Sequence, residues 1–132
     1  MNRLQQLRDD IGNINVLYAE DEDGVREETL LFLKRIFSNI SPAVNGEEGL
    51  NLFKNGSYDL VITDLKMPKM NGRDMLDEIH ALNKDTVLIV MTASDSNMDV
   101  TQTVCDSYLN KPVMFMEFIE VLESLKDKLI KR

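Results

Sequence analysis

Five polar residues at the ends of four predicted strands have side chains suited to phosphoryl chemistry: Glu20, Asp21, Asp64, Thr92 and Lys111. If the fold gathers the three carboxylates, their like charges raise one another's pKa unless a cation compensates. A hard divalent cation such as Mg²⁺, or Mn²⁺ in its place, prefers oxygen ligands of this kind. A carboxylate beside such an ion can act as a nucleophile toward phosphorus, while the hydroxyl and the ammonium offset charge on the transferred group.

Buried strands must carry these residues to one place. Short apolar runs predict strands over 15–19, 40–44, 58–63, 86–91 and 107–110. Helical spacing of apolar residues predicts helices over 24–37, 47–55, 73–82, 97–104 and 114–129. The alternation indicates an α/β, flavodoxin-like, doubly wound parallel sheet, and Pro42 places the second strand at an edge, as in the order 2-1-3-4-5. The polar strand ends then share one edge of the sheet, which favours a Mg²⁺-dependent phosphoryl site.

Each residue also has an ordinary structural interpretation. Asp64 could be a turn residue, and Glu20 with Asp21 could form a solvated loop. Thr92 could cap a helix, and Lys111 could be a surface lysine. Agreement among four strand ends favours the site over four separate coincidences.

The composition limits the class of function. The chain has 132 residues, enough for one domain, and a net charge of −8, which argues against a nucleic-acid surface. The longest apolar run, 87–91, is too short to cross a bilayer, so no membrane association is expected. Cys105 is the only cysteine, which excludes an intrachain disulfide and favours a cytoplasmic location. Neither Cys105 nor His80 belongs to the acidic cluster, which argues against zinc.

In addition, the sequence resembles a known family, the receiver domains of two-component response regulators, and is similar to the single-domain, CheY-like chemotaxis receivers. The resemblance covers about residues 14–130, so residues 1–13 are expected to be an N-terminal extension, either a short helix over 2–9 or a frayed end. The matching segments, in order and at near-family spacing, are Val16–Glu22, Asn45–Glu48, Asp59–Asp64, Met67–Gly72, Met91–Ala93 and Tyr108–Pro112.

The resemblance implies a role for each matching position. Asp64 matches the phosphoacceptor. Asp21 matches the direct metal ligand, Glu20 an acid that often binds through water, and the backbone carbonyl of Lys66 the third protein ligand. Thr92 and Lys111 match the phosphoryl-binding hydroxyl and lysine, with Thr92 also part of the switch. The switch aromatic is Tyr108, and the family usually has a cis peptide where Lys111–Pro112 stands.

Three departures from the family pattern are visible. Glu20 replaces the commoner aspartate, and Gly49 stands where alanine is frequent. Thr92 and Lys111 are only 111 − 92 = 19 positions apart, closer than is usual in receivers. The helix over 97–104 should therefore be shortened to about two to three turns, or be partly unwound. We expect the surface of that helix, the fifth strand and the last helix to be reshaped, so that a standard dimer through it is disfavoured.

The predicted function is that of a signalling phosphoacceptor that assists its own phosphorylation and dephosphorylation, and not of an enzyme. A sensor histidine kinase or a histidine phosphotransfer protein would phosphorylate Asp64 with Mg²⁺ bound, switching a surface that an unknown output protein or domain recognises. One alternative is the N-terminal receiver of a longer regulator with a DNA-binding or second-messenger output domain. An alternative outside this class is a small haloacid-dehalogenase-type phosphatase. Such enzymes have a second acid two residues after the nucleophile, where this chain has Lys66, which disfavours this alternative. A degenerate receiver that only binds proteins is disfavoured by the intact acids, Thr92 and Lys111.

Overall fold

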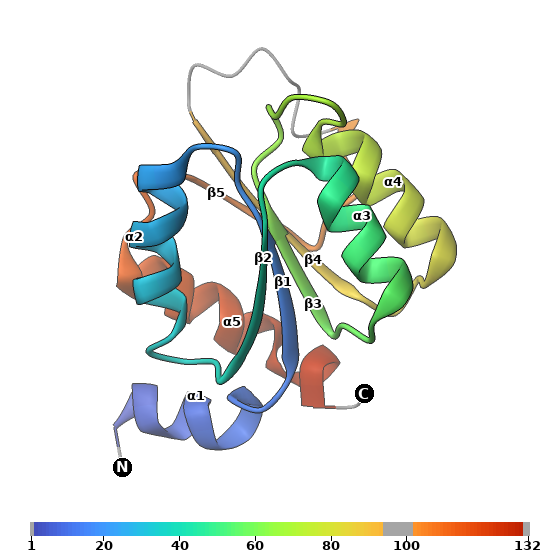
Figure 1. The fold of residues 1–132 in the computed structure, drawn as a ribbon. Coiled ribbons are helices and arrows are strands. Elements are labelled where there is room, and N and C mark those ends of the chain that lie inside the picture. Colours follow the sequence, from blue (N-terminus) through green and yellow to red (C-terminus); the bar gives the residue numbers. More distant parts are fainter. Residues whose placement is uncertain (1, 94–101, 131–132) are drawn as a thin grey trace.

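The computed structural model describes residues 2–93 and 102–130 and contains one parallel sheet (Figure 1). The strands run in the order β2-β1-β3-β4-β5, as predicted, with Pro42 in the edge strand β2. Their bounds are β1 Asn15–Ala19, β2 Asn39–Ala43, β3 Leu60–Thr63, β4 Val87–Ala93 and β5 Ser107–Lys111. All four neighbouring pairs are parallel, so the carboxyl ends of β1, β3, β4 and β5 lie at one edge.

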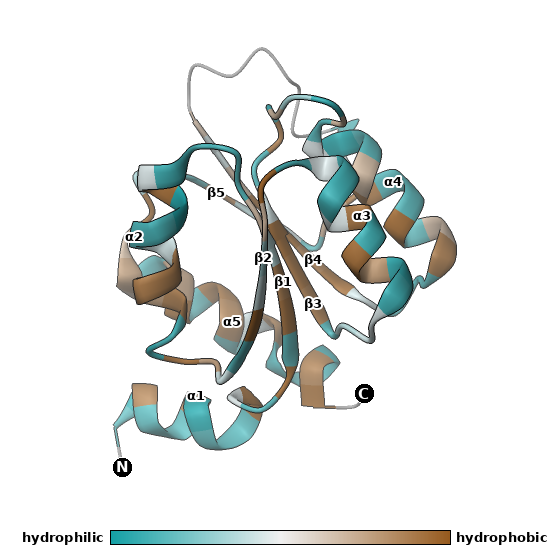
Figure 2. Cartoon of the chain, viewed as in Figure 1, coloured by the Kyte–Doolittle hydropathy of each residue, from teal (hydrophilic) through white to brown (hydrophobic). Residues whose placement is uncertain are grey.

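Helices cover both faces of the sheet, as a parallel sheet requires. On one face lie α1 (Arg3–Ile11), α2 (Asp23–Leu33) and α5 (Phe115–Ile130); on the other lie α3 (Gly46–Asn55) and α4 (Gly72–Leu82). Successive residues of β1 alternate between the two cores: Val16 and Tyr18 pack in the first, Leu17 and Ala19 in the second. Figure 2 shows the result, with hydrophobic strands between helices whose outer faces are hydrophilic.

Two of the predicted helices do not correspond fully to described helices. The helix expected over 24–37 ends at Leu33, because the chain turns there and the N–H groups of Ile36 and Phe37 both donate to the Leu33 carbonyl. Ile36 and Phe37 are nevertheless buried, so the apolar pattern that predicted the helix continues beyond its end. The shortened helix expected over 97–104 falls mainly on residues outside the described ranges; its last residues, 102–104, are described and contain no α-helix.

The N-terminal segment forms a helix, which confirms one of the two alternatives for residues 2–9. The Asn2 side chain accepts a hydrogen bond from the Gln5 N–H, and the Gln5 side chain accepts one from the Asn2 N–H, which forms a capping box. Leu7 and Ile11 are buried in the core that α5 also lines. The division into an extension over 1–13 and a receiver domain over 14–130 stays a prediction.

No helix within the described ranges is both long and apolar enough to span a membrane.

Candidate functional site

The edge formed by the carboxyl ends of the strands gathers the three acids that the sequence singled out. Glu20 and Asp21 follow β1, and Asp64 follows β3, its direct neighbour in the sheet. One carboxylate oxygen from each of the three lies within 4.8 Å of the others. Glu20 is buried, Asp64 is partly buried and Asp21 is exposed. The parallel register therefore builds an oxygen-rich cluster that opens to solvent at Asp21.

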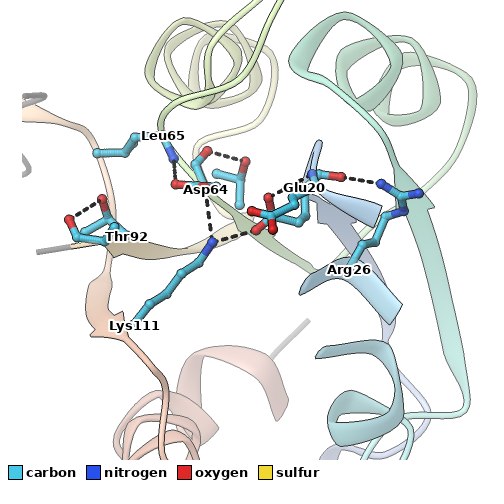
Figure 3. A network of polar contacts seen from close by, with 9 residues as sticks. Glu20, Arg26, Asp64, Leu65, Thr92 and Lys111 are labelled. Carbon is cyan, nitrogen blue, oxygen red and sulfur yellow. Dashed lines mark hydrogen bonds and ion pairs between the residues drawn. The ribbon is translucent and has the colours of Figure 1, made fainter. Parts of the chain in front are cut away.

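Lys111, at the end of β5, reaches across this edge to two of the acids (Figure 3). Its Nζ lies 2.6 Å from Glu20 Oε1 and 3.1 Å from Asp64 Oδ2. Burial raises the pKa of the Glu20 carboxyl, and the bond from Lys111 opposes that rise without cancelling it. Burial lowers the pKa of Lys111, but the bond to Glu20 and the charge of Asp64 outweigh it and hold that pKa above its usual value. The ammonium thus offsets repulsion between two carboxylates.

The backbone around Asp64 is fixed by close contacts. The Leu65 N–H donates to Asp64 Oδ1 at 2.7 Å, and the Thr63 hydroxyl donates to the Asp64 carbonyl at 2.8 Å. The Gly72 N–H donates to the Leu65 carbonyl at 2.7 Å, and a Cβ on Gly72 would overlap the Asp64 carbonyl oxygen. Only glycine allows the start of α4 to lie this close to the end of β3.

The loop between β3 and α4 has three further features. Lys66 lies in it with an exposed side chain, two residues after Asp64. Lys69 has φ 67°, in the left-handed region that favours glycine. The Met70 carbonyl accepts a hydrogen bond from Gly46 at 3.0 Å, which ties this loop to the start of α3. This bond near the end of the loop, together with the bond from the Gly72 N–H to the Leu65 carbonyl near its start, holds the loop in place.

Thr92 lies at a strand end beside the acidic cluster, and Tyr108 lies on β5, the strand that also carries Lys111. Thr92 is buried near the end of β4, and among the described residues its hydroxyl makes a long contact of 3.5 Å with the Ala93 carbonyl (Figure 3). Tyr108, on β5, has 51% of its surface exposed. The Lys111–Pro112 peptide is cis, as expected. The structure thus brings Glu20, Asp21, Asp64 and Lys111 together and places Thr92 at the adjoining strand end.

Sequence reasoning missed one residue at this site, Arg26. Its Nη1 donates to the Glu20 carbonyl at 2.9 Å, and its Nη2 lies 2.6 Å from Asp23 Oδ1 (Figure 3). The signal in the sequence was a cation in the otherwise acidic start of a helix, where the helix dipole disfavours positive charge.

Comparison with known proteins gives one consistent result. The family model of the response regulator receiver domain matches residues 16–123. The transcriptional regulatory protein CiaR of Streptococcus pneumoniae is 33% identical over 122 residues, covering 90% of this chain and 52% of that protein. The response regulator TrrA of Thermotoga maritima, solved in complex with Mg²⁺ and BeF, is 34% identical with a TM-score of 0.76, covering 85% of this chain and 98% of that one.

A third match comes from a protein complex. It is the co-crystal structure of the Saccharomyces cerevisiae histidine phosphotransfer signaling protein Ypd1 with the receiver domain of its response regulator Ssk1. The identity is 28% and the TM-score 0.72, with 86% of this chain and 89% of that chain covered. The chain spans about half the length of the curated relatives it matches.

Proposed function

The chain belongs to the response regulator receiver family, and we propose that its acidic site accepts a phosphoryl group on Asp64. The observation that carries this proposal is the cluster itself: three carboxylates within 4.8 Å of one another, with the Lys111 ammonium bound to two of them. A nucleophilic carboxylate, acidic metal ligands and a cation for the transferred group are the parts that phosphoryl transfer needs.

The donor set suits Mg²⁺ or Mn²⁺. Oxygen ligands alone, supplied by carboxylates and a backbone carbonyl, fit these ions and not softer metals. Glu20, Asp21 and Asp64 would hold the ion with their carboxylates, and Lys66 with its backbone carbonyl. When bound, the ion supplies positive charge that stabilises the phosphoryl oxygens. The buried Glu20 and the exposed Asp21 would then differ in role, with Asp21 binding the ion directly and Glu20 binding it through water.

The proposed donor is a phosphorylated histidine of a sensor histidine kinase or of a histidine phosphotransfer protein. A carboxylate oxygen of Asp64 attacks phosphorus, so that an O–P bond forms while the N–P bond of the phosphohistidine breaks. The electron pair of the broken bond stays on the imidazole nitrogen. Water later cleaves the acyl phosphate, which restores the carboxylate and releases inorganic phosphate. The domain acts as a phosphoacceptor, and it is not a catalyst with a separate substrate.

Lys111, Thr92 and Tyr108 would connect the phosphoryl group to the surface. Lys111 already lies 3.1 Å from Asp64, within reach of a group attached there. Rotation of the buried Thr92 side chain away from its long contact with Ala93 would let its hydroxyl donate to the same group. Tyr108 is exposed on β5, the edge strand that also carries Lys111, and its ring would move when Thr92 binds the phosphoryl group. Phosphorylation would thereby shift the population of two surface shapes.

Two partners follow from this function. The complex of Ypd1 with the Ssk1 receiver supports a histidine phosphotransfer protein or kinase as the phosphodonor. The greater length of the relatives supports a second partner, an output protein or domain that recognises the phosphorylated surface. We place this activity in the cytoplasm, and we assign neither nucleic-acid nor membrane binding to this domain.

Intact-protein mass after incubation with acetyl phosphate tests the proposal. We expect the wild-type protein to gain one phosphoryl group with Mg²⁺ and none with EDTA, and Asp64→Asn to gain none in either buffer. Asp21→Ala should weaken Mg²⁺ binding more than Glu20→Ala. Equal labelling of the wild type and the Asp64→Asn variant would sink the assignment of the acceptor, and the reverse ranking of the two acids would exchange their roles.

A further inference from the structure

Arg26 is bound to the loop that carries the acids, although no part of the proposed chemistry uses it. The residue lies in the first turns of α2, and its side chain runs back toward the start of the helix (Figure 3). Only 15% of the side chain is exposed, whereas its partner Asp23 is 83% exposed. The guanidinium is therefore packed against the loop, and the Asp23 carboxylate that it binds is exposed to solvent.

The two bonds of Arg26 bracket Asp21. Nη1 holds the carbonyl of Glu20, the residue immediately before Asp21, at 2.9 Å. Nη2 holds the carboxylate of Asp23, two residues after it, at 2.6 Å. A planar guanidinium can hold both groups at a fixed spacing, which a lysine ammonium cannot do. Asp21 is itself exposed, so the backbone on either side of it determines where its carboxylate points.

The Glu20 carbonyl is held by Arg26, while the Glu20 side chain is held separately. Glu20 Oε1 binds Lys111, Glu20 Oε2 accepts from the Glu22 N–H at 3.2 Å, and the Glu20 N–H donates to the Ala43 carbonyl at 3.0 Å. Removal of the guanidinium would thus leave the Glu20 side chain and the Glu22 N–H anchored, and would free the Glu20 carbonyl, which belongs to the peptide that joins Glu20 to Asp21.

From this arrangement we infer that Arg26 is a positioning residue, which holds Asp21 in the orientation where its carboxylate joins Glu20 and Asp64 around a divalent cation. The inference rests on the proposed binding of Mg²⁺ at this site. A purely electrostatic role for Arg26 predicts the opposite change in Mg²⁺ affinity. A cation this close to the acids repels Mg²⁺, so neutralising Arg26 would then tighten binding.

Calorimetric titration of Mg²⁺ into the unphosphorylated protein separates the two roles. We expect Arg26→Gln to bind Mg²⁺ about tenfold more weakly than the wild type, the lower end of the effect of outer-shell partners on metal sites. Arg26→Lys, which keeps the charge but cannot make both bonds, should also be weaker than the wild type. Arg35→Gln is the matched control: it removes the same charge just beyond α2, from a guanidinium stacked 4.0 Å over the Phe115 ring. It should leave the affinity unchanged.

Unchanged or tighter binding by Arg26→Gln overturns the inference, as does equal weakening in Arg35→Gln. A wild-type protein that takes up no Mg²⁺ overturns the proposed metal site and the inference with it, whereas normal wild-type binding with normal variants overturns the inference alone. If Arg26→Gln unfolds, Arg26→Lys decides the matter, because wild-type affinity in that variant shows that charge and not the two-bond geometry matters.

Discussion

Replacing Lys111 by methionine measures how strongly its ammonium holds the acidic site together. The substitution keeps much of the aliphatic stem and removes the charge that lies 2.6 Å from Glu20 and 3.1 Å from Asp64. The side chains of Glu20 and Asp64 are only 2% and 16% exposed, so solvent cannot replace the lost partner. Breaking a buried pair on one side typically costs about 3–5 kcal/mol. Because Lys111 itself is 22% exposed, we take the lower end, about 3 kcal/mol.

Urea unfolding followed by circular dichroism reads out this loss. With an m value of about 1.5–2 kcal/mol per molar, Lys111→Met should lower the midpoint by about 1.5–2 M at neutral pH. In a Glu20→Gln background the same substitution should cost about 2 kcal/mol less, because the buried charge is gone. Mg²⁺ should recover part of the stability by binding the folded state. Lys128→Met is the control, since it breaks an exposed pair with Asp106 and should leave the midpoint in place.

The deficit of Lys111→Met should also depend on pH, with a definite sign. Burial already raises the pKa of Glu20 above its unfolded value, and the bond from Lys111 opposes that rise. Without Lys111 the pKa rises further, so the folded state binds a proton more readily than the unfolded state does. The deficit therefore shrinks as the pH falls through the folded pKa of Glu20. An unshifted urea midpoint, or equal costs in the two backgrounds, would refute this view of the site.

Substitutions at three further positions, with Gly24 as a control, test the backbone contact at Asp64, the loop after it and the packing of α1. Gly72→Ala should cost about 2–3 kcal/mol in urea unfolding, because its Cβ would overlap the Asp64 carbonyl, whereas Gly24→Ala, with open space around it, should stabilise α2 by about 0.5–1 kcal/mol; equal effects would contradict the close contact. Lys69→Gly should hold or raise the melting temperature and Lys69→Val should lower it, since a side chain at φ 67° costs about 1 kcal/mol; a stabilised valine variant would contradict the left-handed conformation. Leu7→Ala should cost about 2–4 kcal/mol, because Leu7 is buried in the core; an unchanged midpoint would show that α1 is dispensable.

Most of the fold was predictable because its strands are short apolar runs that end in polar residues. The order of the sheet followed from Pro42 and from the alternation of elements, and the structure confirms it. The end of α2 was wrong by four residues, because Ile36 and Phe37 are buried whether or not they are helical. Periodicity reports burial, and it cannot distinguish the last turn of a helix from a buried turn after it.

At the site, the meeting of Glu20, Asp21, Asp64 and Lys111 was predictable, because the carboxyl ends of parallel strands share an edge. The hydrogen-bond and ion-pair partners of each of these groups were not predictable. Which carboxylate Lys111 contacts depends on side-chain lengths across two strands, and the role of Arg26 depends on a backbone carbonyl, which has no signature in the sequence.

Locating the phosphoryl group tests the central claim most directly. After treatment with acetyl phosphate and Mg²⁺, borohydride reduces an aspartyl phosphate to homoserine, and tandem mass spectrometry of the tryptic peptide 55–66 reads its position. This peptide contains both Asp59 and Asp64, so Asp59 is an internal control. We predict homoserine at position 64 alone, dependent on Mg²⁺. Homoserine at position 59, in another peptide, or nowhere despite a gain in intact mass would contradict the account.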